Sequence, residues 1–98
     1  MPKRSKDWNE ELAKDLRRPK FAQEFILAAL DEGISIQAVL AKAIRAFGVK
    51  EFADKAGLPP SNILRAIHPG HNPTQETLER LLRPWGLVLT IAKARKAS

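Results

Sequence analysis

The stretch VKEFADKAGLPPSNILRAIHPGHNP, residues 49–73, decides the fold of this chain. Its first eight residues predict a short helix that stops at Gly57, and the turn 57–59 leads to a second short helix that begins at a proline. Gly57 occupies the position where such a turn needs a left-handed residue, which glycine supplies without strain. The layout is that of a helix-turn-helix.

The two faces of this pair of helices differ in chemistry. Ala53 lies where the helices are expected to cross most closely, and Ser61 and Arg65, one turn apart, share the outer face of the second helix. The residues expected to face inward are Phe52, Ala56, Leu58, Ile63 and Ile67. The pattern predicts a helix held so that its outer face can enter the major groove of DNA.

The composition is that of one small globular domain with a basic surface. The chain has 98 residues, 44% hydrophobic and 29% charged, and its 17 basic and 11 acidic residues give a net charge of +6. Such a surface attracts polyanions, and nucleic acid, anionic membrane and acidic protein all remain possible partners. We expect a flexible basic tail at 1–7, a single helix-turn-helix domain at 8–92 and a second flexible basic tail at 93–98.

Residue types exclude several classes of site. The absence of cysteine excludes disulfides, thiolate zinc sites and cysteine nucleophiles, and it fits a reducing compartment. No apolar run approaches the roughly 20 residues of a membrane span, and the N-terminus lacks the apolar segment of a signal peptide. We therefore expect a cytoplasmic protein with no membrane partner and no cofactor.

Breakers and caps mark further helices on either side of the central pair. A helix is expected over 8–17, which has helix formers with acids early and bases late, and Pro19 ends it. A second helix begins near Lys20 and closes at Gly33. One face of that second helix carries Phe21, Phe25, Ala28 and Ala29.

Ser35 is a good N-cap for a third helix, which Gly48 separates from the helix-turn-helix. Its apolar stripe consists of Ile36, Val39, Leu40, Ala43, Ile44 and Phe47. Thr74 can cap a last helix, which Gly86 stops. The buried stripe of that helix is expected to hold Leu78, Leu81, Leu82 and Trp85.

The last apolar segment, LVLTIA at 87–92, is β-branched and partly alternating, so it predicts a strand. A lone strand must pair, and the sequence leaves open whether the partner is in this chain, a second copy or another protein. The expected fold is mainly α, with five to six short helices containing a helix-turn-helix and one C-terminal β-strand.

The first turn of the second helix carries the candidates for reading base edges, Pro60, Ser61 and Asn62, with Arg65 on the same face as Ser61. Arginine can donate two hydrogen bonds to guanine, asparagine can read adenine, and serine suits several bases. Two alternatives stay open: Arg65 contacts a phosphate, or Asn62 bonds local backbone. Leu64 can touch a thymine methyl group or pack against the following loop.

Candidates for phosphate contact flank this helix. The start of the first helix offers free backbone N–H groups at Gly48, Val49 and Lys50, with the charge of Lys50 beside them. The breaker loop adds His71 and Asn72 at the end of the second helix. Such contacts position a protein on DNA without specifying sequence.

The chain resembles the Xre/Cro class of bacterial helix-turn-helix regulators in VKEFADKAGLPPSNILRAI, a loop ending in Asn72-Pro73, and TQETLERLLRPWGLVL. With the upstream helix FAQEFILAALDEG, it resembles the HigA-like antidote proteins of bacterial addiction modules, over roughly residues 20–92. The resemblance implies an antitoxin that binds a RelE-type ribonuclease toxin and represses the operon encoding both. It places the base-reading residues at the start of the recognition helix.

Two departures from the class matter. Pro59-Pro60 replaces the polar pair common at the helix start, and Ile67 stands where many members have glutamate. His68-Pro69-Gly70 reshapes the following turn, so the target DNA sequence does not carry over from the class. No motif marks the toxin-binding surface, for which the N-terminal helices and the tails are candidates.

Functions other than that of an antitoxin repressor also fit parts of the sequence. A stand-alone regulator fits the same residues, and a protein-interaction module would use the strand 87–92 and the basic tails with a purely structural helix-turn-helix. An enzyme is not expected, because the only histidines, His68 and His71, stand in a breaker loop without an obvious carboxylate partner. Glu51 and Asp54, at i,i+3 spacing, fit a solvated helix face.

A homodimer is expected, because one recognition helix reads only a few base pairs and symmetric pairs place two of them about 34–36 Å apart. The contact can be formed by the terminal strand or by the helix 74–85. The sequence leaves open whether dimers form only on DNA or only with a toxin bound.

Overall fold

Helix boundaries in the first half of the chain follow the breakers in the sequence. The computed structural model describes residues 10–91, and residues 10–16 are helical at its start. Arg18 is extended, as expected before a proline, and α2 (Pro19–Asp31) begins with the proline itself. After α2 the chain turns at Gly33, whose φ of 90° confirms the expected glycine stop.

Two hydroxyl groups cap the helices that the sequence predicted them to cap. The Ser35 hydroxyl accepts a hydrogen bond from the N–H of Ala38 at 3.2 Å at the start of α3 (Ile36–Phe47). The Thr74 hydroxyl accepts one from the N–H of Thr77, also at 3.2 Å, at the start of α6 (Gln75–Leu82). A short 3₁₀ helix, η1 (Arg83–Trp85), continues α6.

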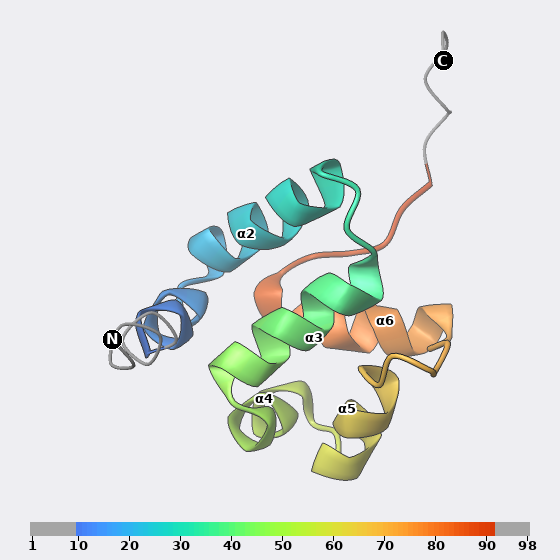
Figure 1. The fold of residues 1–98 in the computed structure, drawn as a ribbon. Helices are drawn as coiled ribbons and strands as arrows, with labels where there is room; N and C mark the ends of the chain where they lie inside the picture. The colour runs from blue at the N-terminus through green and yellow to red at the C-terminus, as the bar shows by residue number, and fades with distance from the viewer. Residues whose placement is uncertain (1–9, 92–98) are drawn as a thin grey trace, which may run out of the picture.

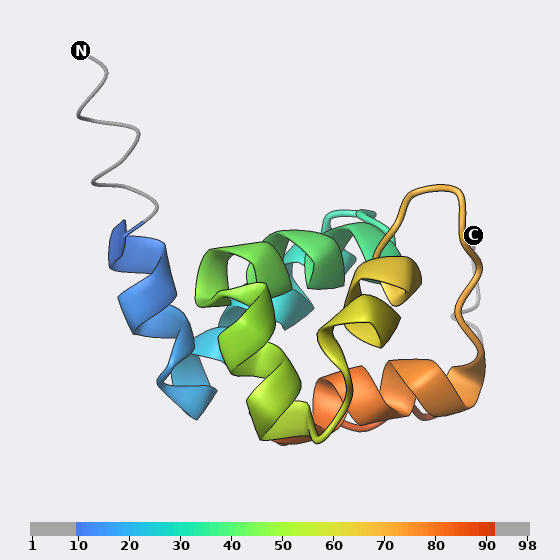
Figure 2. The same ribbon diagram turned by 90° about the horizontal axis from the view of Figure 1, so that it is seen from below.

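The predicted pair of short helices is present. It consists of α4 (Val49–Ala56) and α5 (Pro60–Ala66), joined at Gly57, which is left-handed with φ 69° and ψ 33°. The N–H of Leu58 donates to the carbonyl of Ala53 at 3.1 Å and closes the end of α4. In Figure 1 both helices lie along the lower side of the molecule, and Figure 2 shows them from below beside α6.

An aromatic cluster joins the helix pair to the rest of the core. The rings of Phe52 and Trp85 lie 4.7 Å apart, and Phe47 packs edge-on against Phe52 at 5.8 Å. The indole N–H of Trp85 donates to the carbonyl of Leu16 at 3.3 Å, so the helix at 10–16 is tied to the same cluster. The apolar stripes predicted for α3 and for α6 with η1 are buried or half-buried in this core.

The most deeply buried residues of α2 lie next to the predicted apolar face. Ala22 and Ile26 are fully buried, whereas Phe21 and Phe25 stack on each other half-exposed, 6.1 Å apart. Ala28, expected on the same face as the phenylalanines, is exposed. The small side chain of Ala22 lets α2 approach the core closely, so the row one position further along the helix turns inward.

The predicted strand at 87–92 is wrong over the part that the structure describes. Residues 87–91 form no strand, and no strand occurs anywhere in 10–91 to pair with them. The segment keeps the predicted alternation: Leu87 and Leu89 pack half-buried on the core, while Val88 and Ile91 are 78% and 96% exposed. Without a neighbouring strand its backbone cannot form a ladder, so it remains an extended arm.

The tails expected at 1–7 and 93–98 lie outside the described residues, as do residues 8 and 9 at the start of the first expected helix. Among the described helices, none combines the length and the apolar character needed to cross a membrane.

Candidate nucleic-acid interface

The first turn of α5 forms without help from a side-chain cap. Pro59 is extended, and its carbonyl accepts the N–H groups of Asn62 and Ile63 at 3.0 and 3.2 Å. Pro60 then occupies the first helical position, where a missing N–H costs nothing. Within the described residues the Asn62 side chain makes no hydrogen bond to local backbone. Its amide therefore faces solvent with its donors and acceptor available.

The outer face of α5 is open. All four residues predicted to read bases are exposed, namely Pro60, Ser61, Asn62 and Arg65. Ile63 and Ala66 are buried on the opposite side, and Ile67 follows them into the core. Leu64 is 45% exposed and belongs to the solvent side. The helix therefore presents polar groups outward while its apolar side fixes its position.

A groove between α5 and α6 brings several of the predicted residues together. Asn62 and Arg65 line it from α5, and His71 lines it from the breaker loop. Its volume is about 230 Å³. Thr77 and Arg80 of α6 form the opposite wall, and neither was predicted as a site residue. Both flank the predicted leucine stripe of α6, which is the signal that marks them.

The start of α4 stands apart from this groove. Gly48 has a φ of 111°, and a Cβ atom built on it would collide with the Glu51 carboxylate. Val49 is half-buried against the core, so only Lys50 of this predicted trio is an exposed side chain. A phosphate at this helix start would meet the Glu51 carboxylate. The start of α4 is therefore a less favourable position for phosphate than the groove between α5 and α6.

The breaker loop is held by a residue that the sequence did not single out. The side-chain amide of Gln37, on α3, donates to the carbonyls of Ala66, His68 and His71 at 2.8, 2.9 and 2.7 Å. This amide fixes the end of α5 and the position of His71 at once. Its only signal in the sequence is a polar residue beside the apolar stripe of α3. Asn72, the other loop residue predicted to contact phosphate, is exposed.

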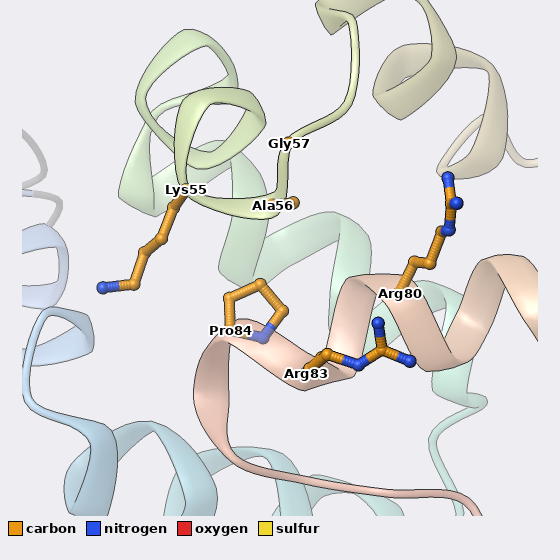
Figure 3. Close-up of a pocket in the computed structure, with 6 residues that line it drawn as sticks. All are labelled: Lys55, Ala56, Gly57, Arg80, Arg83 and Pro84. Carbon is orange, nitrogen blue, oxygen red and sulfur yellow. The ribbon is translucent and has the colours of Figure 1, made fainter.

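A second, basic pocket of about 230 Å³ adjoins the groove (Figure 3). Lys55, Arg80 and Arg83 line it together with Ala56, Gly57 and Pro84. Arg80 thus belongs to both hollows, and neither lining contains a carboxylate. Both hollows are therefore lined by positive and uncharged groups, which suits an anionic ligand.

His68 takes part in a local turn, where its Nδ1 accepts the N–H of Gly70 at 3.1 Å. Over residues 10–91 no group of three or more histidine, cysteine or acidic side chains is arranged to hold a metal ion.

Comparison of the chain with protein-family models, with curated proteins and with solved structures finds no match in any of the three.

Proposed function

We propose that this protein is a sequence-specific DNA-binding repressor. The observation that carries the proposal is the exposed polar face of α5, which is fixed from behind by buried apolar residues. Arg65 and Asn62 would contact base edges, because guanidinium and amide groups match the acceptor and donor patterns of guanine and adenine. Ser61 and Pro60 lie on the first turn, the part of a recognition helix that approaches the bases.

Phosphate contacts would come from around this face. His71 and Asn72 stand in the loop after α5, and Lys50 stands at the start of α4. Gly48 and Val49 would contribute backbone N–H groups there, in competition with the Glu51 carboxylate. The net charge of +6 supports attraction to a polyanion without deciding which one.

The antitoxin role and the RelE-like toxin partner rest on the resemblance to HigA-like antidote proteins. We propose them as the biological setting of the repressor, with the operator upstream of its own gene and a homodimer as the DNA-bound form. A neighbouring gene for a small basic RelE-like protein would support this setting. Its absence would favour a stand-alone regulator.

The test is a binding titration with the DNA immediately upstream of the gene and with scrambled DNA of equal length, at two salt concentrations. Tight binding to the upstream DNA alone, weakened by salt as several phosphate contacts require, is expected. Equal, weak and salt-sensitive binding to both DNAs would mean that charge alone acts, and the repressor proposal would fail.

Arg65→Ala tests the base contact within the same titration. The side chain is exposed, so the fold should survive. A loss of about 1–3 kcal/mol on the upstream DNA is expected, with relaxed specificity at one base pair. Arg45→Ala removes an equally charged, exposed side chain from α3 and serves as the control. Equal losses for the two variants would contradict the assignment of Arg65.

A second candidate function, a protein-interaction module, is favoured by an apolar groove of about 330 Å³ between α2 and α3. Phe25, Ile34 and Val39 line it, and Ile34 is 44% exposed. Under this candidate Ile34→Asp would abolish association with the protein partner, and the chain would bind upstream and scrambled DNA equally weakly with or without the substitution. Retained association with the Ile34→Asp variant would speak against this groove as the contact.

A further inference from the structure

Two arginines at the end of α6 lack the partners that the sequence offers them. Glu76 precedes Arg80, and Glu79 precedes Arg83, each by four residues, the spacing and order that favour an ion pair on a helix. Neither pair forms, and the sole ion pair over residues 10–91 is elsewhere, between Arg18 and Asp15 at 2.8 Å. Both guanidinium groups are exposed to solvent with their donors available.

The two arginines also lie on the same side of the basic pocket. Figure 3 shows Arg80 extending from α6 toward α5, with the Arg83 guanidinium beside its stem, whereas Lys55 points to the opposite side. Arg80 lines the groove that holds Arg65 as well as the basic pocket that holds Arg83. Arg80 therefore links the two hollows, and arginine side chains line them from Arg65 on α5 to Arg83.

This arrangement has an electrostatic cost that an anion would remove. Arg80 and Arg83 are three residues apart, and like charges at such spacing repel each other. The C-terminal end of α6 offsets part of that repulsion, because its carbonyl groups favour cations. The guanidinium fork matches the oxygens of a phosphate group in geometry, and it does so better than an ammonium group.

We propose that Arg80 and Arg83 bind DNA phosphates. These phosphates belong to the strand that borders the major groove entered by α5. The inference rests on the proposed DNA-binding function and extends its contact surface from the helix-turn-helix to the end of α6. These two residues position the protein on DNA, and they carry no information about sequence. Their removal should weaken binding to upstream and scrambled DNA by the same factor.

The test compares the salt dependence of DNA binding between 50 and 200 mM salt for three single variants. Arg80→Gln and Arg83→Gln each remove one proposed phosphate contact, and Arg45→Gln removes one positive charge from an exposed position on α3 that lines neither hollow. Each arginine variant is expected to lower the slope of log affinity against log salt by about 0.9. When the salt is raised from 50 to 200 mM, each arginine variant should therefore lose affinity by a factor about 3.5-fold smaller than the factor by which the wild type loses it. Arg45→Gln should leave the slope unchanged.

The outcomes separate the two proposals. If the wild type prefers upstream DNA and Arg65→Ala relaxes that preference, the repressor function stands whatever the slopes show. Slopes of Arg80→Gln and Arg83→Gln that equal that of Arg45→Gln would then overturn the phosphate assignment alone. A wild type that binds both DNAs equally would overturn the repressor function and, with it, this inference. Thermal denaturation of the three variants checks that each is folded.

Discussion

At the scale of single residues, Gln37 shows how one buried-side contact can position a functional surface. Its amide has two N–H groups, which three carbonyls share at the junction of α5 and the breaker loop. Loss of this amide would leave the carbonyls of Ala66 and His71 without this donor, and it would leave only the backbone N–H of His71 on the carbonyl of His68. The geometry of the groove between α5 and α6 therefore depends on a residue of α3 that does not line it.

Gln37→Met tests this at nearly constant side-chain volume. Because hydrogen bonds at partly buried carbonyls would be lost, the free energy of unfolding should fall by about 1–3 kcal/mol, measured by urea denaturation. Gln75→Met changes an exposed glutamine at the first position of α6 and should move stability by less than about 0.5 kcal/mol. A Gln37→Met midpoint that coincides with that of Gln75→Met would refute the positioning role.

Gly57 has a purely conformational role, so a substitution there should affect the backbone and not a side-chain contact. A Cβ atom added there would meet nothing within 4 Å, yet its φ of 69° is unfavourable for any side chain. Gly57→Ala should therefore destabilise the fold by about 1–2 kcal/mol in urea denaturation. Gly70→Ala should cost less, because the φ of Gly70 is not positive and a Cβ atom added there would meet only the His68 ring, at 3.5 Å. The reverse order would contradict the left-handed requirement.

At the scale of elements, local signals predicted where helices begin and end, and non-local packing decided the rest. Pro19, Ser35 and Thr74 act within one turn of themselves, so their consequences are readable from the sequence. The rotation of α2 toward Ala22 depends on what the rest of the core presents, and the role of Gln37 depends on a loop 29 to 34 residues away. The contribution of Arg80 to the candidate site was missed for the same reason.

The arm at 87–91 gives an element-scale prediction that separates packing from strand pairing. Leu89 is half-buried on the core and Val88 is 78% exposed, although both lie in the same extended segment. Leu89→Ala should lower the free energy of unfolding by about 1 kcal/mol, because apolar area is lost from the core. Val88→Ala should change it by less than about 0.5 kcal/mol. Equal losses would indicate that both faces of the arm are covered in solution, as in a strand paired with a second copy.

At the scale of the whole molecule, the length of α5 limits what one copy can do on DNA. A helix of 7 residues is about 10 Å long, which spans roughly three base pairs. Affinity beyond these few base pairs must come from phosphate contacts or from a second copy. The arginines Arg65, Arg80 and Arg83 would supply the first, and the homodimer proposed above would supply the second.

The spacing of the two half-sites in the DNA tests whether the protein binds as a dimer. If two copies bind through α5, the operator should contain two half-sites about one helical turn, 34–36 Å, apart, and the complex should hold two chains per duplex. Insertion of about five base pairs, half a turn, between the half-sites would place them on opposite faces of the duplex. We expect this insertion to reduce affinity to that of a single half-site, measured by titration, with chain stoichiometry followed by sedimentation. Unchanged affinity and one chain per duplex would show that a single copy binds alone, in which case phosphate contacts from α6 and the breaker loop would have to supply the remaining affinity.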